Sequence, residues 1–390
     1  MTTLRPTPLR LLRSRVPARR GWVPVPASLD WGLAATSAAL SGIGLLLVWS
    51  ATRTDPGSTL LQRQAVGVGL GFVLMWLVSR CDLRVLRAYV PVLYLLALAG
   101  LVVVLTPLGR TVNGSHAWIV LGSGLQFQPS EFAKVALVLA LAMALGELRD
   151  GERRPGPGAV LLALGLAALP MGLIMLQPDL GTTLVFAAVV AGMVVVSGAP
   201  KRWLAGLTAA AGIVLLVVWR LHLIRPYQLQ RLMVLTDPDA DPLGVGYNAT
   251  QARIAIGSGG MFGKGLFHGE QTAGHFVPEQ HTDFIFTVAG EELGFLGAAC
   301  VILLMTVLLW RGLRIAARSA SPYGTVLAGG VVCWLAFQTF VNVGMTVGIL
   351  PITGLPLPFV SYGGSATVST LTAVGLLEAV HRTRSRTPLG

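Results

Sequence analysis

The sequence predicts an all-α polytopic membrane protein of about ten transmembrane helices, with a large extracytoplasmic loop between helices 7 and 8. Apolar residues make up 54% of the 390-residue chain and charged residues only 12%, about half the charged fraction that is typical of a soluble domain. The mean hydropathy is +0.71. The apolar residues gather in runs of about 20, which is the length that an α-helix needs to cross a bilayer.

Ten apolar runs are expected to span the membrane, and the second of them is short. They lie at residues 31–51, 65–79, 88–106, 130–146, 158–176, 180–197, 203–221, 289–310, 324–348 and 364–380. The longest polar interruption, at residues 222–282, is the large loop. The chain therefore divides into a basic tail at residues 1–29, a ten-helix domain at residues 30–381 and a short tail at residues 382–390.

The net charge of +12 orients the chain in the membrane. Most of the 29 Lys and Arg residues fall in cytoplasmic segments if the N-terminus is inside, so the positive-inside rule places both termini in the cytoplasm. The same charges suit anionic lipid, and nucleic acid is not an expected partner. The first apolar run follows an Arg-rich tail and lacks a signal-peptide cleavage site.

The most unusual segment runs from Gly348 to Ala366, between the last two apolar runs. It holds three prolines and four glycines and so cannot continue a helix, yet it is too apolar for an ordinary solvated loop. Irregular backbone beside a bilayer persists only where protein covers it or where it lines a watery cavity. We expect this Pro/Gly run to shape a cavity, with Ser361, Gly363 and Gly364 in its wall.

An acid, Asp283, lies where the large loop meets the eighth apolar run. An ionisable group at membrane depth costs about 2.5–3.5 kcal/mol on insertion scales and marks a functional site by default. The alternative is that Thr282 or Asp283 caps a helix beginning at Phe284. Residue type alone does not separate the two interpretations.

Three further charges are expected to face the same outward cavity. Glu131 and Lys134 open the fourth run and share one helix face, where Lys134 suits a lipid phosphate. The alternative is a helix capped by Ser130 with an exposed ion pair of about 0.2–0.5 kcal/mol. Asp179 opens the sixth run, and capping is again its alternative role.

Several function classes are excluded by missing patterns. Cys81, Cys300 and Cys333 form neither a disulfide framework nor a metal motif. The glycine-rich segment 258–265 lacks P-loop spacing, and the acids at 237–241 lack the EF-hand pattern. There is no nucleophile elbow.

The motifs resemble those of the shape, elongation, division and sporulation (SEDS) family, which includes RodA, FtsW and SpoVE. The matching residues are Asn342, Gly348, Pro351, Gly354 and the segments 128–134, 177–182, 254–260, 278–286, 290–294 and 361–366. The resemblance covers residues 30 to 380, and the His281-Thr282-Asp283 form is more similar to RodA than to FtsW. One departure is Ala117 before Trp118, where the family usually has Arg; His116 is a weak substitute.

The resemblance implies a peptidoglycan glycosyltransferase of the bacterial cytoplasmic membrane, which polymerises lipid II on its outer face for cell elongation and shape. Asp283 aligns with the family's essential aspartate and would be the general base in an inverting transfer. The pyrophosphate leaving group needs a cation, from Lys134, Arg63 or a divalent ion (Mg or Mn) with no assigned ligands. The expected substrate-binding residues are Glu131, Lys134, Trp118, Asp179, Arg63, Ser258, His281, Thr282, Ser361, Gly363 and Gly364.

The implied partners are lipid II, the undecaprenyl-pyrophosphate-linked glycan, membrane lipid and a class B penicillin-binding protein. Two other classes remain: a lipid II flippase without transferase activity, and a scaffold for the penicillin-binding protein. A flippase needs ionisable residues through the bilayer midplane, whereas the charges here cluster near the outer face. A scaffold gives no reason for Asp283, Glu131 and Lys134 to lie together.

Overall fold

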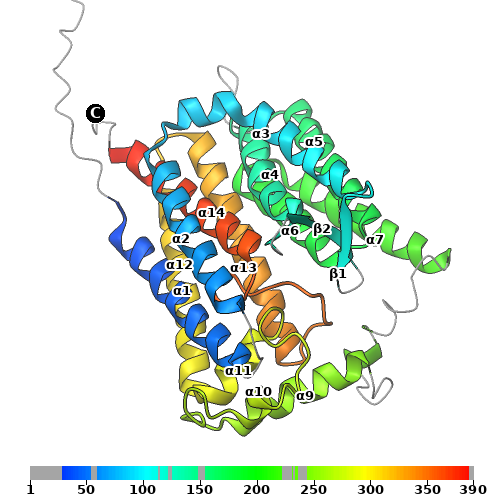
Figure 1. The fold of residues 1–390 in the computed structure, drawn as a ribbon. Helices are drawn as coiled ribbons and strands as arrows, with labels where there is room; N and C mark the ends of the chain where they lie inside the picture. Colours follow the sequence, from blue (N-terminus) through cyan, green and yellow to red (C-terminus); the bar gives the residue numbers. More distant parts are fainter. Residues whose placement is uncertain are drawn as a thin grey trace, which may run out of the picture.

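The computed structural model describes residues 29–53, 59–112, 115–121, 125–147, 154–221, 231, 233–235 and 244–385. The described chain is a helical bundle with one small antiparallel sheet (Figure 1). Its helices are α1 (Trp31–Thr52), α2 (Leu60–Arg80), α3 (Leu83–Val104), α4 (Pro129–Gly146), α5 (Pro157–Leu176), α6 (Leu180–Val196), α7 (Lys201–Arg220), α9 (Val245–Ser258), α10 (Glu270–Ala273), α11 (Ile285–Glu292), α12 (Gly294–Ala317), α13 (Pro322–Thr346) and α14 (Gly364–Ser385).

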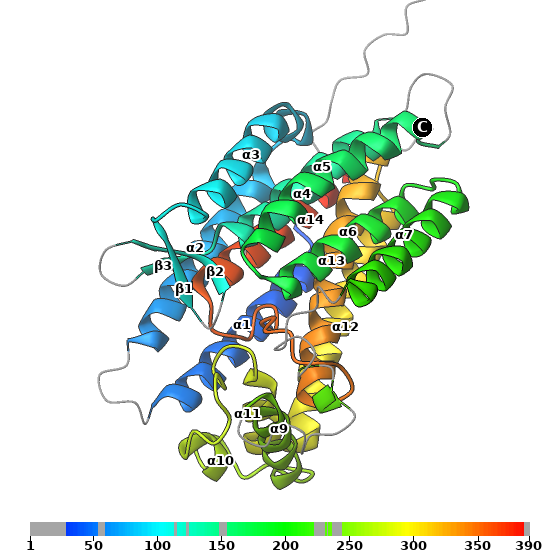
Figure 2. The same ribbon diagram turned by 90° about the vertical axis from the view of Figure 1, so that its right-hand side faces the viewer.

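The all-α membrane class is confirmed. By length and composition, seven of the described helices can cross a membrane, namely α1 to α5, α12 and α13, and α6 is a shorter apolar helix. The expected spans at α7 and α14 are helices of 20 and 22 residues, but they are not among these seven. In both views α9, α10 and α11 gather at one end of the bundle, opposite the end of α14 (Figures 1 and 2).

The bundle has a protein-covered centre formed by α4, α13 and α14. In their most apolar windows, α4 is 83% buried and α13 is 72% buried, against 22% for α3 at the periphery. α14 packs along α2 and buries polar side chains such as Ser369, Thr370 and Glu378. Because protein rather than lipid surrounds α14, its side chains need not be apolar.

The expected eighth span is broken into two helices. α11 ends at Glu292 and α12 begins at Gly294, whose φ of +67° favours glycine. A Cβ at Gly294 would lie 2.2 Å from the Gly263 nitrogen. The N–H of Phe295 donates to the Gly260 carbonyl at 2.9 Å. Residues of the large loop therefore pack into the break, and α11 is a separate helix from α12.

The segment between α3 and α4 folds into a small sheet. Its strands are β1 (Gly109–Val112), β2 (Ser115–Leu121) and β3 (Leu125–Phe127), in the order β1-β2-β3. Arg110 pairs with Trp118, and the register shifts directly after Arg110. The β-branched and aromatic residues of β2 suit a strand.

Candidate functional site

Asp283 lies in a tight turn directly before α11. The N–H groups of Thr282, Asp283 and Phe284 all point to the Glu279 carbonyl, at 3.2, 3.1 and 3.3 Å. The cap residue of α11 is Phe284, and no side chain caps the helix. The Thr282 hydroxyl donates to the Glu279 carboxylate at 3.0 Å. The capping alternative is therefore wrong for both Thr282 and Asp283.

The electrostatic surroundings of Asp283 favour its protonated form. Burial of the half-buried residue is the main cause, followed by repulsion from Glu279, and together they raise the pKa of Asp283 to about 7. Arg231 opposes this shift and Asp179 adds to it. A carboxyl group with a pKa near the operating pH can accept a proton at neutral pH and is suited to general base catalysis.

The Pro/Gly run lies against the turn that holds Asp283. A Cβ added to Gly354 would be 3.4 Å from Oδ2 of Asp283, and Gly354 has a φ of +76°. The N–H of Tyr362 donates to the His281 carbonyl at 2.9 Å, and the two rings are 5.6 Å apart between centroids. The run and the turn are thus in direct contact.

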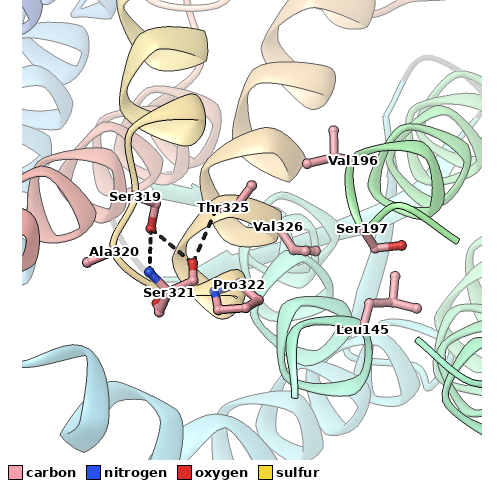
Figure 3. Close-up of a pocket in the computed structure, with 9 residues that line it drawn as sticks. All are labelled: Leu145, Val196, Ser197, Ser319, Ala320, Ser321, Pro322, Thr325 and Val326. Carbon is pink, nitrogen blue, oxygen red and sulfur yellow. Dashed lines mark hydrogen bonds between the residues drawn. The ribbon is translucent and has the colours of Figure 1, made fainter. Parts of the chain in front are cut away.

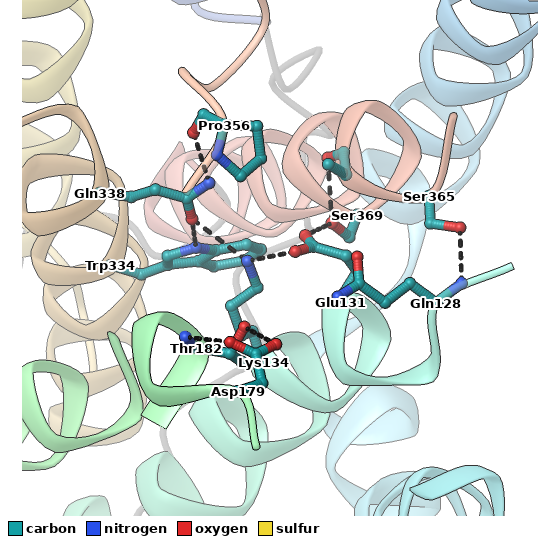
Figure 4. A network of polar contacts seen from close by, with 11 residues as sticks. Gln128, Glu131, Lys134, Asp179, Thr182, Trp334, Gln338, Pro356, Ser365 and Ser369 are labelled. Atoms are coloured by element: carbon teal, nitrogen blue, oxygen red, sulfur yellow. Dashed lines mark hydrogen bonds and ion pairs between the residues drawn. The ribbon is translucent and has the colours of Figure 1, made fainter. Parts of the chain in front are cut away.

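Glu131 and Lys134 are buried in a polar network (Figure 4), so they neither face an open cavity, as expected, nor form the exposed pair of the alternative interpretation. Their exposed fractions are 2% and 1%. Nζ of Lys134 donates to Oε1 of Glu131 at 2.8 Å and to Oε1 of Gln338 at 3.1 Å, and lies 4.9 Å from the Trp334 ring centroid. Oε2 of Glu131 accepts from the Ser369 hydroxyl at 3.1 Å. The pair therefore joins α4 to α13 and α14.

The expected cap of α4 is also corrected. The cap residue is Gln128, followed by Pro129, because proline suits the first helical position, where an N–H has no partner. The Ser130 hydroxyl is buried and has no hydrogen-bond partner among the described residues. The Gln128 N–H instead donates to the Ser365 hydroxyl of α14, at 3.1 Å.

Asp179 caps α6, which confirms the alternative role given to it. Its carboxylate accepts from the Thr182 N–H at 2.9 Å and from the Thr182 hydroxyl at 2.7 Å. It also lies within electrostatic reach of Lys134 and of Asp283, and Figure 4 shows it beside Lys134. Burial raises the pKa of Asp179, which the bonds from Thr182 and the charge of Lys134 oppose.

The other predicted residues divide into two groups. Near the site, the half-buried Arg63 hydrogen-bonds Tyr362, and the Ser361 hydroxyl accepts from the Leu357 N–H at 2.7 Å. The exposed Ser258 ends α9 and donates to the Ala255 carbonyl at 2.9 Å. Trp118 is half-buried in β2. None of the described contacts joins Ser258 or Trp118 to Asp283.

The two predicted glycines differ from each other. The Gly363 N–H donates to Oε1 of Gln64 at 3.0 Å. Gly364 begins α14, and a Cβ there would meet nothing within 4 Å. A Cβ at Gly364 would therefore meet no neighbour, whereas a Cβ at Gly354 would contact the carboxyl of Asp283.

Sequence reasoning missed Gln64 and Gln338, two buried amides in membrane helices. Gln64 donates to the Ser361 carbonyl and to the Thr367 hydroxyl, both at 3.1 Å. Gln338 holds Lys134 and also donates to the Pro356 carbonyl at 2.8 Å. A lone polar residue inside an apolar run is a usable signal for such roles.

The described residues contain no group of three or more His, Cys, Asp and Glu side chains that could hold a metal ion. A dedicated protein cage for a divalent cation therefore does not fit this part of the chain. Mg²⁺ is commonly held by one or two carboxylates together with substrate phosphates, and Asp283 and Asp179 could contribute only in that manner.

A cavity of about 350 Å³ lies at the N-terminal end of α13, the end away from Asn342 (Figure 3). None of its lining residues carries a charge: Leu145, Val196, Ser197, Ser319, Ala320, Ser321, Pro322, Thr325 and Val326. Ser321 caps the start of α13. This cavity includes none of the predicted site residues.

The sequence and the fold of this chain are similar to those of known proteins. The family model FTSW_RODA_SPOVE, described as "Cell cycle protein", matches residues 31–386. The chain is 39% identical over 346 residues to the protein named peptidoglycan glycosyltransferase MrdB of Escherichia coli (strain K12), covering 89% of this chain and 91% of that protein.

Two solved structures are similar over 92% of this chain and 98% of theirs. One, described under the words "Structural coordination of polymerization and crosslinking by a peptidoglycan synthase complex", has a TM-score of 0.77 at 37% identity. The other, the rod shape determining protein RodA of Thermus thermophilus, has a TM-score of 0.68 at 35% identity.

Proposed function

Because the chain belongs to the FtsW, RodA and SpoVE family of cell cycle proteins, we propose that it is a peptidoglycan glycosyltransferase. It polymerises lipid II into glycan strands on the outer face of the cytoplasmic membrane and serves cell elongation and shape. The observation that carries the proposal is the place of Asp283 in a turn packed against the Pro/Gly run, where its pKa is raised to about 7. A relative of 39% identity bears the name of this activity.

In this reaction Asp283 is the general base. Its carboxylate takes the proton from the 4-hydroxyl of the acceptor sugar, and the oxygen forms a bond to the anomeric carbon of the lipid-linked chain. The bond from that carbon to the pyrophosphate oxygen breaks, and the undecaprenyl pyrophosphate leaves with the electron pair. A single displacement inverts the α linkage to β.

The leaving pyrophosphate needs positive charge close to it. Arg63 suits this role because it is half-buried and bonded to Tyr362 beside His281. Lys134 is already neutralised by Glu131 in the described structure, so a contact with substrate requires this pair to open. A divalent cation bound together with the pyrophosphate would supply the same charge.

The remaining substrate contacts follow from their places around Asp283. His281, Thr282, Ser361, Gly363 and Gly364 belong to the turn and the run that meet there, and Asp179 faces the same region. Trp118 and Ser258 are assigned to more distant parts of a long lipid-linked substrate.

Orientation and partners are part of the proposal. Both termini lie in the cytoplasm, because Arg84, Lys201 and Arg318 are among the basic residues at the expected inner helix ends. The similar peptidoglycan synthase complex supports a class B penicillin-binding protein as the partner that cross-links the product.

The flippase alternative needs a polar opening on the inner side for an anionic head group. The cavity at that end of α13 has no charged lining residue (Figure 3), so it does not suit a pyrophosphate. Incubation of the purified chain with lipid II, without other enzymes, tests the proposal. A transferase makes glycan polymer, whereas a flippase or a scaffold makes none.

A further inference from the structure

Asn342 is a buried amide of α13 that contacts both segments flanking Asp283. Its Nδ2 donates to the Asp283 carbonyl at 2.8 Å and to the Leu355 carbonyl at 2.7 Å. The residue is 0% exposed. A single side chain therefore fixes the turn before α11 and the Pro/Gly run to the same helix.

The buried amide of Asn342 carries a cost in folding free energy. Oδ1 of Asn342 is buried and has no hydrogen-bond partner among the described residues, although an unpaired buried acceptor normally costs about 1–3 kcal/mol. A leucine of similar size would avoid that cost inside a membrane helix. An amide provides the two hydrogen bonds that Nδ2 donates to backbone carbonyls, and a leucine provides neither.

Asn342 is one of three residues on a single face of α13 that hold the run. Gln338, Asn342 and Met345 follow helical spacing. Gln338 donates to the Pro356 carbonyl at 2.8 Å, and the sulfur of Met345 accepts from the Thr353 N–H at 3.5 Å. Among the described hydrogen bonds of these three, only those of Asn342 also reach Asp283.

We propose that Asn342 is a positioning residue for Asp283. Its bond to the Asp283 carbonyl fixes the backbone from which the carboxyl projects. Its bond to Leu355 holds the neighbouring Gly354 against that carboxyl, where a Cβ would lie 3.4 Å from Oδ2. The inference rests on the proposed role of Asp283 as the general base.

The test compares Asn342→Leu with Met345→Leu, a control on the same helix face. Hydrogen–deuterium exchange of residues 279–284 is expected to become faster in Asn342→Leu and to stay unchanged in Met345→Leu. With lipid II, kcat per folded molecule of Asn342→Leu should fall on the order of 10- to 100-fold, while KM changes less than about twofold. If Asn342→Leu does not fold, Asn342→Ser, which keeps one donor, should show the same pattern more weakly.

Two results would overturn the inference. One is wild-type kcat per folded molecule in Asn342→Leu, with only the melting temperature lowered. The other is an equal loss of kcat in Met345→Leu. Failure of the proposed function is recognised separately, because wild-type protein would then make no polymer while the exchange comparison would still report on the Asn342 bond.

Discussion

Gly354 lies directly against the carboxyl of Asp283, since a Cβ at Gly354 would be 3.4 Å from Oδ2. Its φ of +76° is a left-handed conformation that costs other residues about 1–2 kcal/mol. The Pro/Gly run therefore meets the proposed base through a residue without a side chain.

Gly354→Ala is expected to lower the rate of lipid II polymerisation, because a side chain at a φ of +76° strains the backbone that lies beside Asp283. Gly198→Ala is the matched control, since Gly198 has a φ of +72° and a Cβ there meets nothing within 4 Å. Polymer formation per folded molecule is the measurement. Equal rates in both variants and in wild type would show that the run does not shape the site.

Activity is expected to rise with pH through about 7, because Asp283 must be deprotonated to accept a proton and its pKa is about 7. Stability should change in the opposite direction. In the unfolded state Asp283 has its ordinary pKa of 3.8 and releases its proton above that pH, whereas the folded state keeps the proton up to about pH 7. The free energy of unfolding therefore falls as the pH rises from about 4 to about 7. Asp283→Asn should remove this pH dependence of stability.

Glu279→Gln is expected to move the acidic limb of the pH–rate profile to lower pH. Loss of the Glu279 charge removes a repulsion that raises the pKa of Asp283. Glu270→Gln is a control with the same change of charge, because Glu270 pairs with Lys264 elsewhere in the loop. An acidic limb at the wild-type position in Glu279→Gln would contradict this account of the pKa.

Lys134→Ala is expected to destabilise the protein by about 3–5 kcal/mol, because it leaves the buried Glu131 without its cation. An exposed pair, the alternative interpretation of the sequence, would contribute only about 0.2–0.5 kcal/mol. The combined change Lys134→Met and Glu131→Gln should recover much of the loss. Thermal unfolding in detergent measures both, and a melting temperature unchanged in Lys134→Ala would contradict the buried network.

The sequence predicted the elements whose signals are local. Apolar runs identify the membrane helices, and the prolines and glycines identify the irregular run. Asp283 was found because an acid stood at the edge of an apolar run. Asp179 was correctly given helix capping as an alternative, since an aspartate side chain can accept hydrogen bonds from the first N–H groups of a helix.

Features that depend on distant contacts could not be predicted. The burial of Lys134 requires Trp334 and Gln338 from α13, and Gln338 lies 204 residues away along the chain. The break at Gly294 depends on the loop around Gly263. The sequence also could not show that Gly354, rather than Gly364, lies beside Asp283, because that depends on a contact between segments that are distant in the chain.

The most direct test of the account is glycan polymerisation by purified Asp283→Asn, with lipid II as the substrate and thermal unfolding as the check on folding. The amide keeps the size of the side chain but cannot accept the proton. The account predicts a folded protein that makes no polymer, beside a wild-type protein that does. Polymer formation at the wild-type rate by Asp283→Asn would contradict the assignment of Asp283 as the general base.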